Sequence, residues 1–290
     1  MQAMTMVRSR LREYAMLMRW HRPIGSLLLL WPTLWAVWTA GAGRPSPMTV
    51  IVFVAGVFVM RSAGCVINDF ADRKFDPQVK RTRERPLAAG RVTPREAIIL
   101  FVVLCIAGFA LVMMLNALTV ALAFVGAFLA VSYPFTKRYT NLPQFYLGVA
   151  FGWGIPMAFA AETGGVPAAG WVMLGANIFW AVAYDTEYAM VDRDDDVKIG
   201  VKSTAILFGR WDRALVGACH ALTIGFLAWD GVLVGQGLLY YAGLVGASMF
   251  AAYQQVLIRS RDRDRCFRAF LNNNYFGAAV YIGALLGYYR

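Results

Sequence analysis

The sequence contains almost no histidine and none of the short motifs that mark common soluble active sites. Only His21 and His220 occur in its 290 residues. A G-x-S-x-G nucleophile turn, a Walker loop, a dinucleotide-binding glycine fingerprint and an H-E-x-x-H zinc motif are all absent. These absences argue against serine-hydrolase, nucleotide-binding and zinc-protease chemistry. We expect both histidines to be interfacial or packing residues rather than catalysts.

Cysteines are also few and are scattered along the chain. The four thiols belong to Cys65, Cys105, Cys219 and Cys266, and no pair has the C-x-x-C spacing. The pattern favours neither a disulfide framework nor a zinc site, and we expect four buried apolar thiols. The first 20 residues carry cations but no short apolar core with a cleavage site, so we predict no removable signal peptide.

Apolar residues dominate the chain. They make up 59% of it, and the mean hydropathy is +0.53, which is too apolar for an ordinary soluble domain. Segments near the ~20 apolar residues that cross a hydrocarbon core recur at about 24–41, 49–67, 97–115, 117–136, 142–161, 167–184, 214–230, 237–258 and 273–289. We predict an all-α, polytopic membrane protein of about nine transmembrane helices, forming a single domain over residues 1–290.

The distribution of Lys and Arg predicts how the chain is oriented. Cytoplasmic loops collect these residues, and all but three of the 28 fall on one side of the predicted helices. The exceptions are Arg44 and Arg290, on the opposite side, and Arg61, within the second helix. We therefore expect a cytoplasmic N-terminus and an external C-terminus. Because no basic domain stands apart, the net charge of +11 does not indicate a nucleic-acid partner.

Acidic residues gather in two windows, where topology alone would favour cations. Nine of the 17 acids lie in residues 69–76 and 185–196. Asp72 and Asp76 are four residues apart, as are Asp192 and Asp196, and each stands 120 residues from its counterpart. We interpret this as a weak repeat of two four-helix halves plus a ninth helix, with the acidic helix ends facing each other across a central cavity.

Each window places polar side chains along one face of a helix. Residues three, four, seven or eleven apart share a face. The first stripe is Asn68, Asp72 and Asp76, and the second is Asp185, Tyr188, Asp192 and Asp196. The remaining acids of the second window, Glu187, Asp194 and Asp195, lie off the stripe, and we expect them to be solvated.

The residue types in these stripes suit a hard divalent cation. Carboxylates four residues apart repel each other unless a cation compensates them. Oxygen donors without a nearby histidine or thiolate are typical of Mg²⁺, which prefers one or two carboxylates plus phosphate oxygens and water. We predict that the stripes hold a diphosphate through magnesium.

Neighbouring cations fit the same ligand, because guanidinium groups bind phosphate oxygens bidentately. The first stripe is followed by Lys80, Arg81, Arg83 and Arg85, and the second by Lys198 and Lys202. Lys137 and Arg138 lie at the end of the predicted fourth helix. Topology alone explains most of these cations, and only the acids beside them suggest a further role.

Arg61 is a charge inside a predicted membrane helix. It precedes Asn68 by seven residues and Asp72 by eleven, so it shares their face, about 10 Å deeper at 1.5 Å per residue. Snorkelling to the cytoplasmic surface is possible at that depth. We favour a buried role, because intramembrane charges facing a bundle interior are functional-site candidates and Arg61 could hold a substrate carboxylate.

These motifs resemble those of a known family. "NDFADRKFD" (68–76) is similar to the N-D-x-x-D-x-x-x-D motif of the UbiA superfamily of intramembrane aromatic prenyltransferases, and "DTEYAMVDRDDD" (185–196) to its D-x-x-Y-A-x-x-D-x-x-x-D motif. The stretches "RPIGSLLLLWPTLWA" (22–36), "KRTRERPLAAG" (80–90), "YPFTKRYTNLPQ" (133–144), "GWGIPMAFAA" (152–161), "DVKIGVKSTAILFG" (196–209) and "FLNNNYFG" (270–277) resemble its bacterial branch that prenylates 4-hydroxybenzoate for ubiquinone.

The resemblance implies a nine-helix fold in the bacterial plasma membrane, with a central cavity that opens laterally to the lipid bilayer. It implies the substrates polyprenyl diphosphate and 4-hydroxybenzoate, with Mg²⁺ as cofactor. Mg²⁺ and diphosphate sites would lie at Asn68, Asp72, Asp76, Asp192 and Asp196. Asp185 and Tyr188 match further motif positions, Arg81, Arg85 and Lys137 match diphosphate-binding cations with Arg138 beside them, and Arg61 matches a position beside the aromatic acceptor.

The expected chemistry is ionisation of the allylic diphosphate followed by attack of the aromatic ring ortho to its hydroxyl. Aromatic faces can shelter a carbocation, and Tyr133 and Tyr188 are candidates by position. Asp185 would either take the ring proton or order the site.

Three alternatives are weighed against this function. The acceptor could be a naphthoate, homogentisate or haem, although Arg61 and the branch-specific stretches weigh against these. The D-G-x-x-A-R core of CDP-alcohol phosphotransferases is absent. A divalent-cation transporter would tend to place its acids at the membrane midplane, whereas these acids lie at cytoplasmic helix ends.

Overall fold

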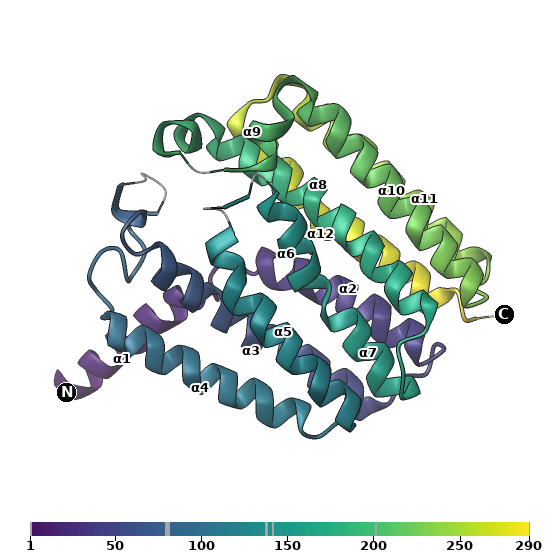
Figure 1. Ribbon diagram of the computed structural model, residues 1–290, viewed down its shortest axis with the longest axis horizontal. Coiled ribbons are helices and arrows are strands. Elements are labelled where there is room, and N and C mark those ends of the chain that lie inside the picture. The colour runs from purple at the N-terminus through teal and green to yellow at the C-terminus, as the bar shows by residue number, and fades with distance from the viewer. Residues whose placement is uncertain (1, 79–81, 137–138, 141, 201, 290) are drawn as a thin grey trace.

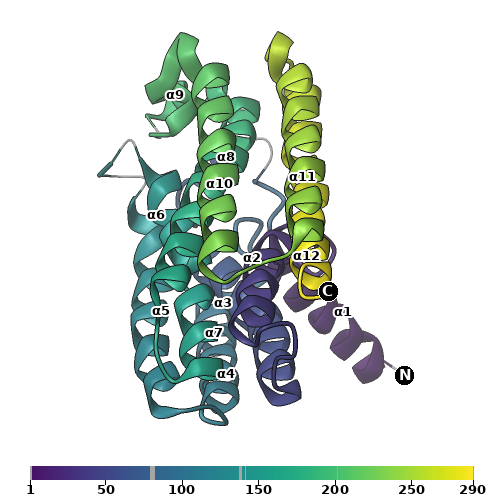
Figure 2. The same ribbon diagram turned by 90° about the vertical axis from the view of Figure 1, so that its right-hand side faces the viewer.

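The computed structural model describes residues 2–78, 82–136, 139–140, 142–200 and 202–289, and all regular structure within these ranges is helical. The helices are α1 (Gln2–Leu17), α2 (Ile24–Ala40), α3 (Pro47–Asp72), η1 (Asp76–Gln78), α4 (Pro94–Val112), α5 (Ala117–Thr136), α6 (Pro143–Gly152), α7 (Gly154–Thr163), α8 (Ala168–Ile199), α9 (Thr204–Phe208), η2 (Gly209–Trp211), α10 (Asp212–Leu233), α11 (Leu238–Leu257), η3 (Ile258–Ser260) and α12 (Arg263–Leu286). Figures 1 and 2 show the long helices side by side, and in Figure 1 α4 lies at one edge and α10 with α11 at the other. The all-α prediction is confirmed.

Several helices are suited to a membrane. By length and composition, α3, α4, α5 and the segment Thr204–Leu233 can each cross one, and α2 is a shorter apolar helix. Exposed apolar side chains cover α4 and α5, as expected for helices that face lipid. The protein is therefore a membrane protein, and the full count of nine spans stays a prediction.

One predicted span, 142–161, is two helices instead of one. α6 ends at Gly152 and α7 begins at Gly154, with Trp153 between them. Pro156 explains the break, because a proline lacks the N–H that would bond to the carbonyl four residues earlier and its ring clashes with that carbonyl. Here the carbonyl belongs to Gly152. Asn177 of α8 packs beside the break and donates to the carbonyl of Gly148, 2.9 Å away.

The longest helix, α8, extends well beyond the span that the sequence predicted. Its 32 residues correspond to about 48 Å at 1.5 Å per residue, whereas a hydrocarbon core is about 30 Å thick. The second acidic window, residues 185–196, lies within about the last four turns. The helix ends at Gly200, whose φ of 71° is in the left-handed region that glycine adopts readily.

An aromatic core holds α8 against α2 and α12. The Trp180 ring lies 5.1 Å from Trp35 and stacks on Phe276 at 5.5 Å between centroids. Trp35 donates its indole N–H to the carbonyl of Gly277, 2.9 Å away, and all three rings are fully buried. The two halves of the chain are therefore packed together directly behind the cavity described below.

The N-terminal helix α1 lies at the edge of the bundle, beside the start of α4 (Figure 1). Tyr14 donates to Glu96 at 2.8 Å, and Arg91 pairs with Glu13 at 2.9 Å. Leu17 is fully buried in a small apolar cluster with α3 and α4 residues. These contacts fix the chain that leads into Arg19, which reaches the site.

Candidate active site

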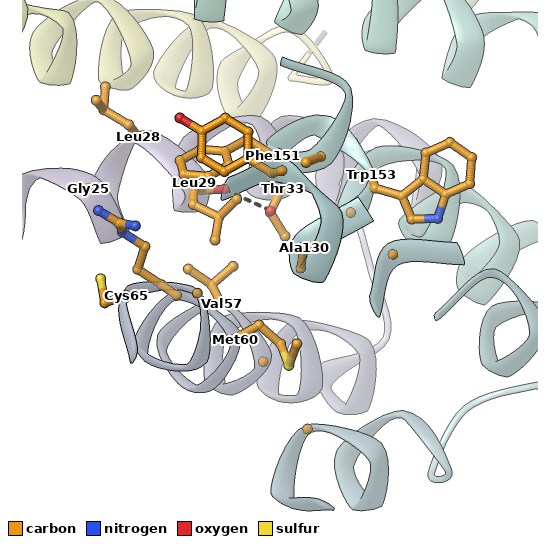
Figure 3. A pocket seen from close by; sticks show the side chains of 18 of the residues that line it. Gly25, Leu28, Leu29, Thr33, Val57, Met60, Cys65, Ala130, Phe151 and Trp153 are labelled. Carbon is orange, nitrogen blue, oxygen red and sulfur yellow. Dashed lines mark hydrogen bonds between the residues drawn. The ribbon is translucent and has the colours of Figure 1, made fainter. Parts of the chain in front are cut away.

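Side chains from α2 to α8 and from α12 enclose a cavity of about 620 Å³. In Figure 3, Leu28 and Leu29 of α2 lie on one wall, and Val57 and Met60 of α3 lie on the other. Apolar groups continue this lining along α4 and α5. The cavity is thus a largely apolar space inside the bundle, and its few polar groups stand out.

Both acidic windows contribute to this one cavity. Asp69 lines it from α3, with Asn68 beside it, and Asp185 and Tyr188 line it from α8. Tyr133 of α5 also lines it and lies within electrostatic range of Asp185 and Asp72. Residues that are more than 100 positions apart in the sequence are therefore brought together, as the repeat hypothesis expected.

The first stripe is not one continuous helical face. Asn68 and Asp72 lie on α3, with Asn68 Nδ2 3.4 Å from Asp72 Oδ2, but α3 ends at Asp72. Asp76 instead begins η1, so the expectation that it shares their helix is wrong. Pro77 explains the difference, because an α-helix running through it would lose a hydrogen bond and meet the carbonyl of Arg73.

Asp76 faces an arginine of the loop that follows it. Arg85 Nη1 lies 3.1 Å from Asp76 Oδ1 and 2.9 Å from Asp76 Oδ2. Burial raises the pKa of the Asp76 carboxyl, the charge of Arg85 opposes that shift, and the neighbouring acids Asp69 and Asp72 add to it. Arg85 therefore offsets part of the rise that burial causes in the pKa of Asp76.

Asp69, a motif residue to which the sequence assigned no role, organises this end of the cavity. Asp69 is 1% exposed, and its Oδ1 accepts from Arg19 at 2.6 Å and from Arg85 at 3.1 Å. Arg19, Arg85 and Asp69 all line the cavity. Asp69 lies off the helical stripe, and its partners are 50 and 16 residues away, so helical spacing held no signal for this cluster.

The second stripe lies on one helix, as predicted. Asp185, Tyr188, Asp192 and Asp196 all belong to α8, and Asp192 and Asp196 are half-buried. The Tyr188 ring packs 4.7 Å from the Phe270 ring of α12, which also lines the cavity.

Of the acids off this stripe, Glu187 is not solvated as the sequence suggested, whereas the side chains of Asp194 and Asp195 are exposed as expected. Glu187 is fully buried, and its Oε2 accepts from Asn273 Nδ2 at 2.8 Å. Asp194 and Asp195 both pair with Arg263, at 3.1 and 3.2 Å. Glu187 points away from the stripe toward α12, because one step along a helix turns a side chain by about 100°.

Arg61 lies at the cavity wall, in agreement with the buried role that we favoured. Its guanidinium carbon lies 5.6 Å from the centroid of the Phe151 ring. It packs tightly on Gly25, where an added Cβ would come within 2.3 Å of Arg61 Nη2. The absence of a side chain at Gly25 therefore sets where the guanidinium lies.

Four predicted diphosphate-binding cations, Lys80, Arg81, Lys137 and Arg138, lie outside the described residues. The expectations for the histidines and cysteines are partly met. His220 is a buried packing residue beside Phe276, whereas only Cys65 and Cys266 are buried thiols and the other two cysteines are half-buried.

The donor set fits a hard divalent ion that is shared with a substrate. Within the described ranges, no three His, Cys, Asp or Glu side chains come together in a group that could hold a metal alone. Mg²⁺ needs only one or two carboxylates where phosphate oxygens and water complete its shell. Asn68 with Asp72 at the end of α3, and Asp192 with Asp196 on α8, offer such partial sets. Of these four described residues, only Asn68 lines the cavity itself.

The fold occurs in solved structures. A UbiA homologue from Aeropyrum pernix K1, in its apo form, superposes with a TM-score of 0.77 and 25% sequence identity, covering 89% of this chain and 96% of that one. A UbiA homologue from Archaeoglobus fulgidus bound to GPP and Mg²⁺ superposes with a TM-score of 0.72 and 17% identity, covering 92% and 99%. The second likeness concerns the fold alone.

Sequence relatives give the family. A 4-hydroxybenzoate octaprenyltransferase from Methylococcus capsulatus is 60% identical over 282 residues, which are 97% of this chain and 97% of the relative. One from Nitrosococcus oceani is 58% identical over 97% of this chain and 99% of its own length. The model of the UbiA prenyltransferase family matches residues 29–278. The chain is therefore an enzyme of the UbiA prenyltransferase family.

Proposed function

We propose that the protein transfers a polyprenyl group from polyprenyl diphosphate to the 3-position of 4-hydroxybenzoate, ortho to its hydroxyl, as a step of ubiquinone biosynthesis. The names of the near-full-length relatives support this acceptor. The observation that carries the proposal is the single cavity onto which Asn68, Asp185 and Arg61 converge. The proposal is supported by this cavity because residues at or beside each acidic window and one deep cation border the same space.

The diphosphate end of the substrate occupies the cytoplasmic end of the cavity. Bound Mg²⁺ supplies positive charge that stabilises the departing diphosphate. We assign its ligands to Asn68, Asp72, Asp76, Asp192 and Asp196. Arg85 donates to the phosphate oxygens, together with Arg81, Lys137 and Arg138, which lie outside the described residues.

Arg61 holds the carboxylate of the acceptor. A guanidinium group binds a carboxylate bidentately, and this one lies deeper in the cavity than Asn68 on the same helix. The aromatic ring of the acceptor then lies between Arg61 and the allylic carbon.

The reaction breaks the allylic C–O bond, and diphosphate leaves with the electron pair. The ring carbon ortho to the hydroxyl forms the new C–C bond, and loss of its proton restores aromaticity. Tyr133, Tyr188 and Phe270 present aromatic faces at the cavity wall, which stabilise the carbocation. The apolar lining keeps water away from it. Asp185 is placed to accept the ring proton or to order the site.

The apolar part of the cavity, between α3, α4 and α5, receives the prenyl chain from the lipid bilayer. We propose the plasma membrane of a bacterium as its location, with the N-terminus and both acidic windows on the cytoplasmic side and the C-terminus outside. The concentration of Lys and Arg on one side supports this orientation.

A prenyl-transfer assay on purified protein in lipid tests the proposal. Geranyl diphosphate and 4-hydroxybenzoate are supplied with Mg²⁺ or with chelator, and the products are identified by mass spectrometry and NMR. We expect 3-geranyl-4-hydroxybenzoate only when Mg²⁺ is present.

Two other outcomes would change the assignment. Release of diphosphate without this product would show that the acceptor is wrong, and a naphthoate or homogentisate would be tried next. Inactivity of folded protein, with energised Mg²⁺ uptake into vesicles, would favour a transporter.

A further inference from the structure

A buried carboxylate outside the cavity binds the helix that carries the second acidic window. Asp212, the first residue of α10, is fully buried. Arg261 donates to it from Nη2 at 2.6 Å and from Nε at 2.9 Å. Arg193 of α8 donates to Asp212 Oδ2 from Nη1 at 3.3 Å, and the backbone N–H of Arg213 donates to Oδ1 at 2.7 Å.

Arg193 lies near the end of α8, among the acids of the second window. It follows Asp192 directly and precedes Asp196 by three residues. On the helix it shares a face with Met190, which packs in an apolar cluster with residues of α10, α11 and α12. The ion pair with Asp212 continues that packed face beyond the apolar cluster, into the last turns of α8.

The carboxylate is itself held from a third segment. Arg261, between η3 and α12, has a φ of 55°, a left-handed conformation that is uncommon for residues other than glycine. In this conformation Arg261 donates to Asp212 from both Nε and Nη2, and its Nη2 also donates to the carbonyl of Arg210 at 3.0 Å. Asp212 therefore stays in place even if Arg193 is removed.

We propose that Asp212 and Arg193 are positioning residues, which hold the last turns of α8 so that Asp192 and Asp196 face the diphosphate. This inference rests on the proposed function, because it concerns how the proposed Mg²⁺ ligands are oriented. Residues that hold metal ligands in their orientation are important for affinity, and their removal typically weakens metal binding by about 10–100-fold.

The main test replaces Arg193 with glutamine and measures Mg²⁺ binding without turnover. The Mg²⁺ concentration that gives half-maximal thermal stabilisation is titrated in the presence of inorganic diphosphate. We expect it to rise roughly tenfold in R193Q, with faster hydrogen exchange of residues 190–199. In assays, KM for the prenyl diphosphate should rise while KM for 4-hydroxybenzoate stays unchanged, and R193K should recover part of the Mg²⁺ affinity.

The sign of the effect separates positioning from simple electrostatics. Loss of a cation beside Asp192 should by itself strengthen Mg²⁺ binding, because like charges repel. A weaker affinity in R193Q therefore requires displacement of the carboxylates. The D212N variant tests whether Arg193 binds the diphosphate directly. Loss of the Asp212 charge releases Arg193 from its ion pair and leaves its guanidinium group available to the diphosphate. Positioning predicts a raised KM for the prenyl diphosphate in D212N, and direct binding predicts an unchanged or lower one.

The control is R263Q, which breaks the exposed pairs of Arg263 with Asp194 and Asp195 on the same stretch of α8. Exposed ion pairs contribute little, so Mg²⁺ affinity should stay at the wild-type value. An unchanged R193Q, or an equal loss in R263Q, would overturn the inference. If the wild type itself shows no Mg²⁺-dependent transfer, it is the proposed function that fails.

Discussion

The two acidic windows are held in different ways. In the first, α3 ends at Asp72, and the buried Asp69 binds Arg19 and Arg85 at the cavity wall itself. In the second, α8 continues without a break past Asp196, and the buried Asp212 binds its arginines from the neighbouring helix, outside the cavity. Each window is thus fixed by a buried aspartate that bridges two arginines.

The difference lies in what each aspartate controls. Asp69 orients Arg19 and Arg85, which line the cavity, so it acts on groups next to the proposed diphosphate site. Asp212 acts only through the helix, since its arginines hold the backbone that carries the acids. The first window combines ligand binding and support in one cluster, whereas the second separates them.

The largest predicted effect compares the acids of the two windows directly. Asp72→Ala and Asp192→Ala should each lower kcat by at least about 100-fold, because each removes a proposed ligand of the Mg²⁺ whose positive charge would stabilise the departing diphosphate. Both proteins should still insert and purify normally. The measurement is prenyl transfer at saturating Mg²⁺, with D194A as the control, since Asp194 is exposed. Near-normal turnover in either variant would remove that window from the diphosphate site.

Helical spacing accounts for what the sequence revealed about these windows. The i, i+3, i+7, i+11 pattern placed Asp185, Tyr188, Asp192 and Asp196 correctly, because α8 is continuous there. The same rule failed at Asp76, where Pro77 stops the helix. Hydropathy likewise identified the apolar segments but not the break at Trp153. Pro156 causes that break within a uniformly apolar run, where hydropathy does not change.

The two supporting aspartates could not be found from spacing. Asp69 contacts Arg19 across 50 residues and Asp212 contacts Arg261 across 49, and such distances depend on how the helices pack. A single sequence contains many possible pairs of this kind. Glu187 was misjudged for the same reason, because its burial against Asn273 depends on where α12 lies.

The next effect concerns Asp69, the supporting aspartate of the first window. Asp69→Asn removes the charge that orients Arg19 and Arg85, so KM for the prenyl diphosphate should rise by roughly tenfold or more. Loss of one member of a buried pair costs about 3–5 kcal/mol, and the partial exposure of both arginines places the expected loss below that range. Thermal unfolding and KM are measured beside D212N. A KM for 4-hydroxybenzoate that rises in D69N as much as that for the diphosphate would contradict this role.

A smaller effect tests how the cavity positions Arg61. In Gly25→Ala the new methyl group would meet the guanidinium, so Arg61 must shift from the Phe151 ring. KM for 4-hydroxybenzoate should rise several-fold, by about 1 kcal/mol of lost binding, while KM for the diphosphate stays constant. The control is Gly225→Ala, where no atom lies within 4 Å of the new Cβ. An unchanged acceptor KM in both G25A and R61A would show that the carboxylate binds elsewhere.

The smallest effect concerns the N-terminal cap of the next long helix after each window. After the first, Thr93 caps α4 by accepting from the Glu96 backbone N–H at 3.2 Å, while Glu96 accepts from the Thr93 N–H at 2.8 Å. The next long helix after the second, α10, has no side-chain cap from Trp211 before it, and Asp212 in its first turn accepts from the Arg213 N–H. Thr93→Ala should therefore cost about 1 kcal/mol of stability without changing any KM. Thermal unfolding measures the loss, and a change in KM for the diphosphate would mean that this cap also positions the loop bearing Arg85.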